Sequence, residues 1–83
     1  MKITVKLYAL LGKYLPPGAA NHQAVLEAPE GATAFDVMDQ LGVPREACHL
    51  VLVNGIFLEP DKRGTEPLSE RDALAMWPPV AGG

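Results

Sequence analysis

A single helix pattern at residues 33–42 constrains the fold of this chain more than any other feature. Thr33 and Asp36 have the spacing of a capping box at its start, and Gly42 suits the left-handed residue that commonly ends a helix. Its apolar face, at helical spacing, comprises Ala34, Val37, Met38 and Leu41. Strand patterns occupy both sides of the helix, and a chain of 83 residues can build only one small core. The sequence therefore predicts an α+β fold in which one helix packs against a sheet.

Five segments have the composition or the polar–apolar alternation of strands. They are residues 2–10, 22–28, 49–53, 56–58 and 73–77. The first two are close enough in sequence to form an antiparallel hairpin around a short apolar turn at 10–15. Asn54-Gly55 is the strongest short signal for a type I′ hairpin turn, and residues 59–69 read as a loop. We expect a β-grasp fold: a mixed sheet of four to five strands, its first and last strands side by side in the middle, with one main helix across one face.

Composition excludes several classes of function. Ten acidic against seven basic residues give a net charge of −3, which argues against a nucleic-acid partner. No apolar run approaches the ~20 residues that span a bilayer, so we expect no membrane association. One cysteine, Cys48, rules out an internal disulfide and a cysteine-rich zinc site. The first residues alternate and lack the apolar segment of a signal peptide, and we therefore expect a cytoplasmic protein.

Few side chains in this sequence could carry catalysis. His22 and His49 are isolated, neither has the spacing of a metal ligand, and we expect no metal site. Cys48 could pair with His49 as a nucleophile, but neighbouring strand residues face opposite sides, and a plain buried thiol is favoured. No nucleophile elbow, phosphate-binding loop or dinucleotide motif is present. The chain is expected to have no catalytic residues of its own.

The segment Pro78-Pro79-Val80-Ala81-Gly82-Gly83 is the remaining candidate. Two prolines favour an extended chain and keep it out of the sheet, so we expect a domain at residues 1–77 and an extended diglycine tail at 78–83. Six extended residues reach roughly 20 Å, and the small residues could enter a narrow channel in a partner. There the carboxylate of Gly83 would become an acyl donor once it is adenylated. The alternative interpretation is an ordinary frayed terminus.

Three segments of the chain resemble the MoaD/ThiS family of ubiquitin-like sulfur carriers, and within it the small subunits of molybdopterin synthase. They are Val5-Lys6-Leu7-Tyr8-Ala9 with the following residues 10–15, the hairpin Val53-Asn54-Gly55, and the end from Trp77 to Gly83. The last is the most specific, because those subunits are known for a Pro-Pro-Val-Ala-Gly-Gly end. The resemblance extends over essentially the whole chain, although the middle matches by pattern only.

The resemblance implies a cycle of sulfur transfer through Gly83. A ubiquitin-activator-like enzyme would consume ATP to form a glycyl adenylate, and a persulfide donor would convert it to a thiocarboxylate. The tail would then enter the large subunit of molybdopterin synthase and donate sulfur to the dithiolene of the molybdenum or tungsten cofactor. Gly82 would supply the narrow approach, and Pro78, Pro79, Val80 and Ala81 would guide the tail. No cofactor would be bound permanently.

Several alternatives stay open at this stage. The carrier could serve another pathway (thiamine, cysteine or a natural product), Gly83 could form isopeptide bonds as in a protein modifier, or the tail could be inert. Partner docking is expected on an exposed sheet face near Phe57, Met76 and Trp77. Arg71-Asp72 stands where family members usually have Gly-Asp, which we interpret as a changed turn without consequence for the tail.

Overall fold

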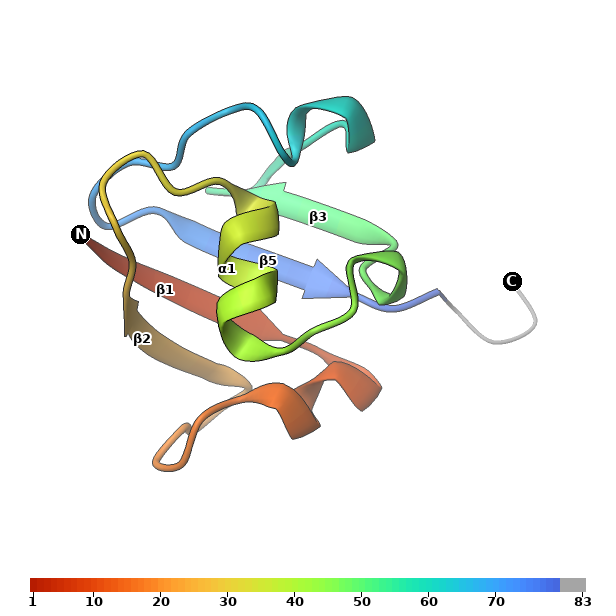
Figure 1. The fold of residues 1–83 in the computed structure, drawn as a ribbon. Helices are drawn as coiled ribbons and strands as arrows, with labels where there is room; N and C mark the ends of the chain where they lie inside the picture. Colours follow the sequence, from red (N-terminus) through yellow and green to blue (C-terminus); the bar gives the residue numbers. More distant parts are fainter. Residues whose placement is uncertain (80–83) are drawn as a thin grey trace.

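A five-stranded sheet and one α-helix form two layers in the computed structural model, which describes residues 1–79 (Figure 1). The strands are β1 (Lys2–Leu7), β2 (Gln23–Glu27), β3 (Leu50–Val53), β4 (Ile56–Phe57) and β5 (Ala73–Trp77), and the helix is α1 (Ala34–Leu41). Their order in the sheet is β2-β1-β5-β3-β4. The central pair, β1 and β5, is parallel, and the other neighbours are antiparallel. The β-grasp prediction is confirmed, including the first and last strands side by side in the middle.

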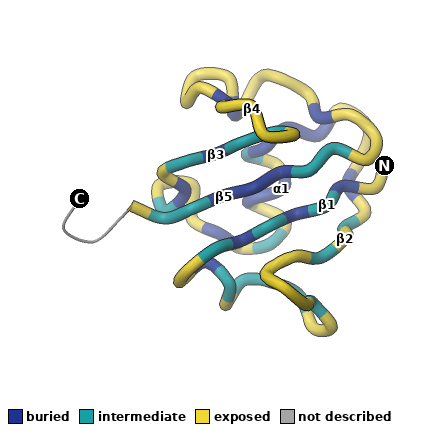
Figure 2. Tube along the Cα trace, turned by 180° about the vertical axis from the view of Figure 1, so that it is seen from behind, coloured by how far each residue is buried: buried dark blue, intermediate teal, exposed yellow. Residues whose placement is uncertain are grey.

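The core lies between the sheet and α1. Ile3, Val5 and Leu7 of β1 alternate toward the helix and are fully buried, as are Leu74 and Met76 of β5. Ala34, Val37 and Met38 of α1 meet them from the other side. No helix formed by residues 1–79 covers the opposite face of the sheet, and Figure 2 shows its strands uncovered, with α1 behind them.

The ends of α1 form as the sequence predicts. The Thr33 hydroxyl accepts from the Asp36 N–H (3.3 Å), and the Asp36 carboxylate accepts from the Thr33 N–H (2.9 Å), so the capping box is complete. Gly42 ends the helix at φ +78°. The predicted type I′ turn is also present, because Asn54 and Gly55 both have positive φ (52° and 83°).

Two differences from the sequence prediction concern the connections. The first strand ends at Leu7, three residues early, because its parallel pairing with β5 stops at the Leu7–Met76 pair and Ala9 turns to φ +53°. A 3-10 turn, η1 (Ala9–Tyr14), follows. A further 3-10 turn, η3 (Pro60–Lys62), lies in the segment predicted to be a loop, and another, η2 (Arg45–Ala47), lies where the sequence predicted no element. Single turns leave no periodic signal in a sequence. Among the described residues, no helix has the length and apolarity to cross a membrane.

Candidate functional site

The candidate site begins where β5 ends, at Trp77. The His49 N–H donates to the Trp77 carbonyl (2.8 Å), and on the other side the Tyr8 N–H donates to the Met76 carbonyl (3.2 Å). The segments on both sides of β5 therefore stay hydrogen-bonded to it up to the end of the strand. Pro78 and Pro79 follow and have no N–H, so the ladder stops there and the chain leaves the sheet (Figure 1).

Three aromatic rings stack beside this exit. The Trp77 and Tyr8 ring centroids lie 4.4 Å apart with the planes 9° from parallel. His22 stacks on Tyr8, with centroids 5.8 Å apart and planes 24° from parallel. A stacked aromatic pair adds about 0.5–1.5 kcal/mol beyond the area it buries. The stack thus holds the side chain that immediately precedes the two prolines.

His22 reaches the stack from a strained turn. Asn21 and His22 both have positive φ (54° and 61°), and Ala20 and Gln23 exchange two backbone hydrogen bonds around them (3.2 and 3.1 Å). This is the geometry of a type I′ turn, whose second position usually holds glycine. A histidine there is strained, and strained backbone often marks a functional site. The sequence predicted no role at this site for Tyr8 or His22. An Asn-His pair is only a weak sequence signal for a type I′ turn, and contacts between rings far apart in the sequence give no sequence signal at all.

The predicted docking residues Phe57, Met76 and Trp77 do not share one face. Phe57 pairs with Leu52 and Trp77 with Leu50, so both side chains lie on the uncovered face of the sheet. Phe57 is 51% exposed, and Trp77 is half-buried. The prediction for Met76 is wrong: alternation turns its side chain toward α1, where it is completely buried in the core.

Cys48 is a buried thiol, as the sequence favoured. Its Sγ lies 3.9 Å from the Pro44 carbonyl oxygen. Burial raises the pKa of the thiol to about 11, and the positive charge of Arg63 opposes that rise. A thiol with this pKa is protonated at neutral pH and is a poor nucleophile. Within residues 1–79, no three His, Cys, Asp or Glu side chains are grouped to hold a metal ion.

Arg63 links the interior to the base of the tail. Its buried guanidinium donates to the carbonyls of Leu58 (3.0 Å), Cys48 (3.1 Å) and His49 (3.3 Å). His49 in turn holds Trp77, so one side chain connects the residue after β4, the two residues before β3 and the last residue of β5. No role for Arg63 was predicted from the sequence.

The tail itself is only partly described. Pro78 is half-buried and Pro79 exposed, directly after β5. The predictions for Val80, Ala81, Gly82 and Gly83 fall on residues that lie outside the described part of the chain.

The family to which the chain belongs follows from its sequence similarity to known proteins. The model of the ThiS family matches residues 15–83, most of the chain. The chain belongs to the ThiS family. Its members are small carrier proteins rather than enzymes, and this one is a ubiquitin-like protein of the sulfur-carrier or protein-modifier kind. No curated protein sequence matches the chain.

Solved structures agree on the fold. SAMP1 from Haloferax volcanii is 26% identical, with a TM-score of 0.70 and both chains covered completely. The HVO 2177 protein of the same organism is 25% identical, with a TM-score of 0.74, over 100% of this chain and 87% of that one. Subunit 1 in a complex of subunits 1 and 2 of molybdopterin-converting factor from Helicobacter pylori has a TM-score of 0.58 over all of both chains. At 17% identity, that last likeness is one of fold.

Proposed function

We propose that this chain is a sulfur carrier whose Gly83 carboxylate is adenylated, converted to a thiocarboxylate and used to build the dithiolene of molybdopterin. The observation that carries the proposal is that the ThiS family match extends through Gly82 and Gly83. The end of β5 at Trp77 supports it, because Pro78 and Pro79 follow directly and have no N–H with which to extend the sheet ladder. In this proposal residues 1–77 are the domain and residues 78–83 the tail.

The chemistry needs one group from this chain. The Gly83 carboxylate attacks the α-phosphate of ATP and releases pyrophosphate, which leaves an acyl adenylate. The terminal sulfur of a persulfide then displaces AMP, and a second thiol on the donor releases the thiocarboxylate as a disulfide forms. The bases and the ATP-binding groups belong to the activating enzyme and the sulfur donor. Cys48 takes no part, since its thiol is buried and protonated.

The base of the tail is suited to directing it into a partner. The Trp77–Tyr8–His22 stack and the His49 hydrogen bond fix the point from which Pro78 departs. A segment already fixed at one end loses less conformational entropy when it binds. Two prolines then extend the chain, and Val80, Ala81 and Gly82 would lead Gly83 into a channel too narrow for larger side chains.

The proposed partner for sulfur transfer is the large subunit of molybdopterin synthase. A protein of the same fold is described in complex with subunit 2 of molybdopterin-converting factor, which supports this kind of partner. Docking would use the uncovered face of the sheet, where Phe57 and Trp77 both lie. Because adenylation of the tail needs ATP, we expect the carrier to act in the cytoplasm. The product would be a molybdenum or tungsten cofactor, with thiamine, cysteine or natural-product pathways as alternative destinations.

One observation favours a second function, that of a protein modifier. SAMP1, also described as small archaeal modifier protein 1, aligns over the whole of this chain. In that role the Gly83 adenylate would pass its acyl group to a lysine amine and form an isopeptide bond. Both functions share the adenylate and differ in the nucleophile that receives the acyl group.

Intact-mass spectrometry of the protein isolated from its own cells separates these functions. A sulfur carrier gives a second species, heavier by the difference between sulfur and oxygen, which is lost when Gly83 is deleted. A modifier gives conjugates with other proteins that carry the tail on a lysine. If neither species forms when the activating enzyme, ATP and a persulfide donor are supplied, both functions are wrong.

A further inference from the structure

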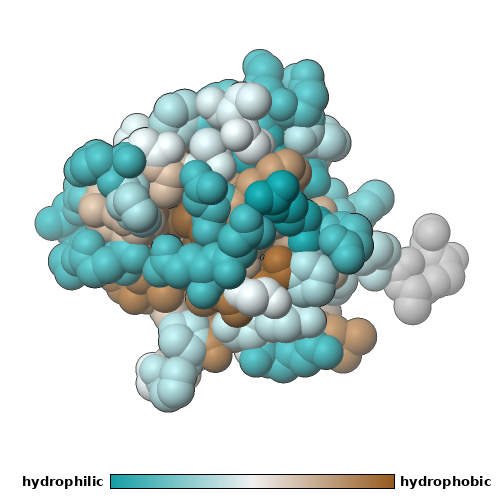
Figure 3. Space-filling model, viewed as in Figure 1, coloured by the Kyte–Doolittle hydropathy of each residue, from teal (hydrophilic) through white to brown (hydrophobic). Residues whose placement is uncertain are grey.

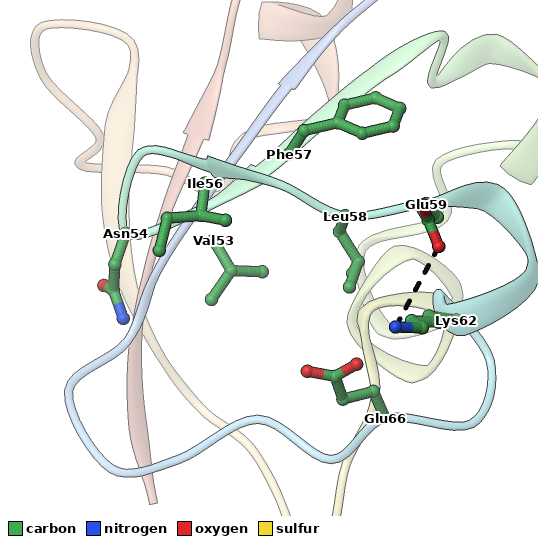
Figure 4. A pocket seen from close by; sticks show the side chains of 8 residues that line it. All are labelled: Val53, Asn54, Ile56, Phe57, Leu58, Glu59, Lys62 and Glu66. Atoms are coloured by element: carbon green, nitrogen blue, oxygen red, sulfur yellow. Dashed lines mark ion pairs between the residues drawn. The ribbon is translucent and has the colours of Figure 1, made fainter.

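A hollow lies at the edge of the sheet, apart from the tail. It is formed between the β3–β4 hairpin and the loop at residues 59–66, and its volume is about 440 Å³ (Figure 4). Val53 pairs with Leu74 at the start of β5, whereas the tail leaves from the other end of that strand. The hollow and the tail exit are therefore at opposite ends of the molecule's central strand.

One wall of the hollow is apolar. Val53 and Ile56 are directly paired across the hairpin and face the helix side of the sheet, and Leu58 continues the wall. Ile56 is 73% exposed, one of the most exposed large apolar residues in the described part of the chain. In Figure 4 the side chains of Val53 and Leu58 point into the hollow, while the Phe57 ring points away from it. Leu58 is buried in the core, so the apolar surface that this wall offers to a partner comes from the exposed Ile56 and the half-buried Val53.

The opposite rim is charged. The Lys62 ammonium lies 3.9 Å from the Glu59 carboxylate, so these two charges offset each other. Glu66 forms no ion pair with any of residues 1–79. Its carboxylate points toward the middle of the hollow in Figure 4. The hollow thus combines an apolar wall with one carboxylate whose charge is not balanced.

We infer that this hollow binds an arginine side chain presented by an exposed segment of a partner protein. The aliphatic stem of the arginine would lie along Ile56 and Val53, and its guanidinium would reach Glu66. Guanidinium suits the site better than ammonium, because it is planar, weakly hydrated and able to bond a carboxylate with two N–H groups. The net charge of −3 favours a basic partner as well.

This site is separate from the proposed sulfur chemistry. Its wall belongs to the helix side of the sheet, whereas Phe57 and Trp77 lie on the uncovered face. A partner bound here would hold the carrier while the tail and the uncovered face remain available to a second protein. The inference therefore stands whether or not Gly83 carries sulfur.

Amide chemical-shift mapping of the full chain tests the inference with N-acetyl-arginine amide as the probe. N-acetyl-citrulline amide, its neutral isostere, and N-acetyl-glutamate amide serve as matched probes. Arginine is expected to give saturable shifts at Ile56, Leu58 and Glu66, with a Kd on the order of millimolar for one small side chain. Equal shifts with citrulline, stronger binding of glutamate, or no saturable shifts at these residues would overturn the inference.

Two variants should change the affinity for arginine in opposite directions. Glu66→Gln removes the free carboxylate and should weaken arginine binding by about two- to fivefold, as expected for an exposed charge pair. Lys62→Gln removes the competing cation and should tighten binding by a similar factor. Glu46→Gln, at an exposed acid in η2 away from the hollow, is the control and should leave binding unchanged. If Glu66→Gln and Glu46→Gln behave alike, the shifts reflect net charge alone and the site is wrong.

Discussion

Arg71 shows at the level of one residue how a turn can hold a side chain in a strained backbone conformation. Its φ is +68°, and its N–H donates to the Lys2 carbonyl (2.7 Å), so the turn before β5 requires a left-handed residue. A side chain in that conformation costs roughly 1–2 kcal/mol, a cost that glycine does not have. The Gly-Asp that the family resemblance leads us to expect here would suit this left-handed position, whereas Arg71 occupies it at a cost in strain.

Replacing Arg71 with glycine should stabilise the protein. Relief of the left-handed strain is partly offset by the greater freedom of glycine in the unfolded chain, which leaves a gain of about 0.5–1 kcal/mol. Urea denaturation measures the free energy of unfolding. Arg71→Ala is the matched control, because it removes the same charge and keeps a Cβ, and it should give no such gain. Equal gains from both variants would mean that the charge of Arg71, rather than its φ, is the destabilising feature.

Cys48 should resist thiol reagents while the protein is folded. Burial raises its pKa from 9.0 to about 11, so almost no thiolate is present at pH 8, and the side chain is 3% exposed. The rate of reaction with a chromogenic disulfide at pH 8 measures this, with the denatured protein as the control that reacts at once. Because folding raises this pKa, the thiol's contribution to stability is present below pH 9 and declines as the pH rises toward 11. Rapid reaction of the folded protein would contradict the buried position.

At the scale of elements, the sequence predicted the features that depend on residues close together in the chain. The caps of α1 and the Asn54-Gly55 turn were predictable because each depends on residues within four positions of one another. The prediction that Met76 faces outward was wrong. The face of a strand that becomes buried depends on where the helix packs, and the strand's own sequence does not specify this. The aromatic stack could not be predicted at all: Tyr8, His22 and Trp77 meet only through the parallel pairing of β1 with β5 and the strained turn before β2.

The aromatic stack should stabilise the end of β5. In Tyr8→Leu an apolar side chain of moderate size remains, but the ring between Trp77 and His22 is lost, and we expect a loss of about 1–2 kcal/mol from the two stacked pairs. Trp77 is the single tryptophan, so its fluorescence reports on this place alone. Its emission should shift to the red as the ring becomes more hydrated. Tyr14→Leu, in η1 outside the stack, should leave the emission unchanged; a shift of the same size there would show that the signal does not come from the stack.

At the scale of the whole molecule, the proposed function would assign different tasks to the small domain and to the tail. A ubiquitin-like domain of this size supplies a rigid base, surfaces for partners and a fixed exit at Trp77. The proposed chemistry would take place roughly 20 Å farther along an extended tail, inside other proteins. Under the proposed function, this division would explain why no catalytic groups are needed near the exit, because the enzymes that act on the tail would supply them.

A change at Gly82 should separate folding from sulfur transfer. Gly82→Val adds a β-branched side chain next to the acyl group, and a channel shaped for two glycines should exclude it, so thiocarboxylate formation should fall below detection. Thermal melting should be unchanged, because the substitution lies beyond the last strand. Intact-mass spectrometry after incubation with the activating enzyme, ATP and a persulfide donor measures the product. Glu30→Val, an equally bulky exposed change in the turn before α1, is the control and should react normally. If Gly82→Val forms the thiocarboxylate as fast as that control, the tail does not enter a narrow channel, and the function assigned to its small residues is wrong.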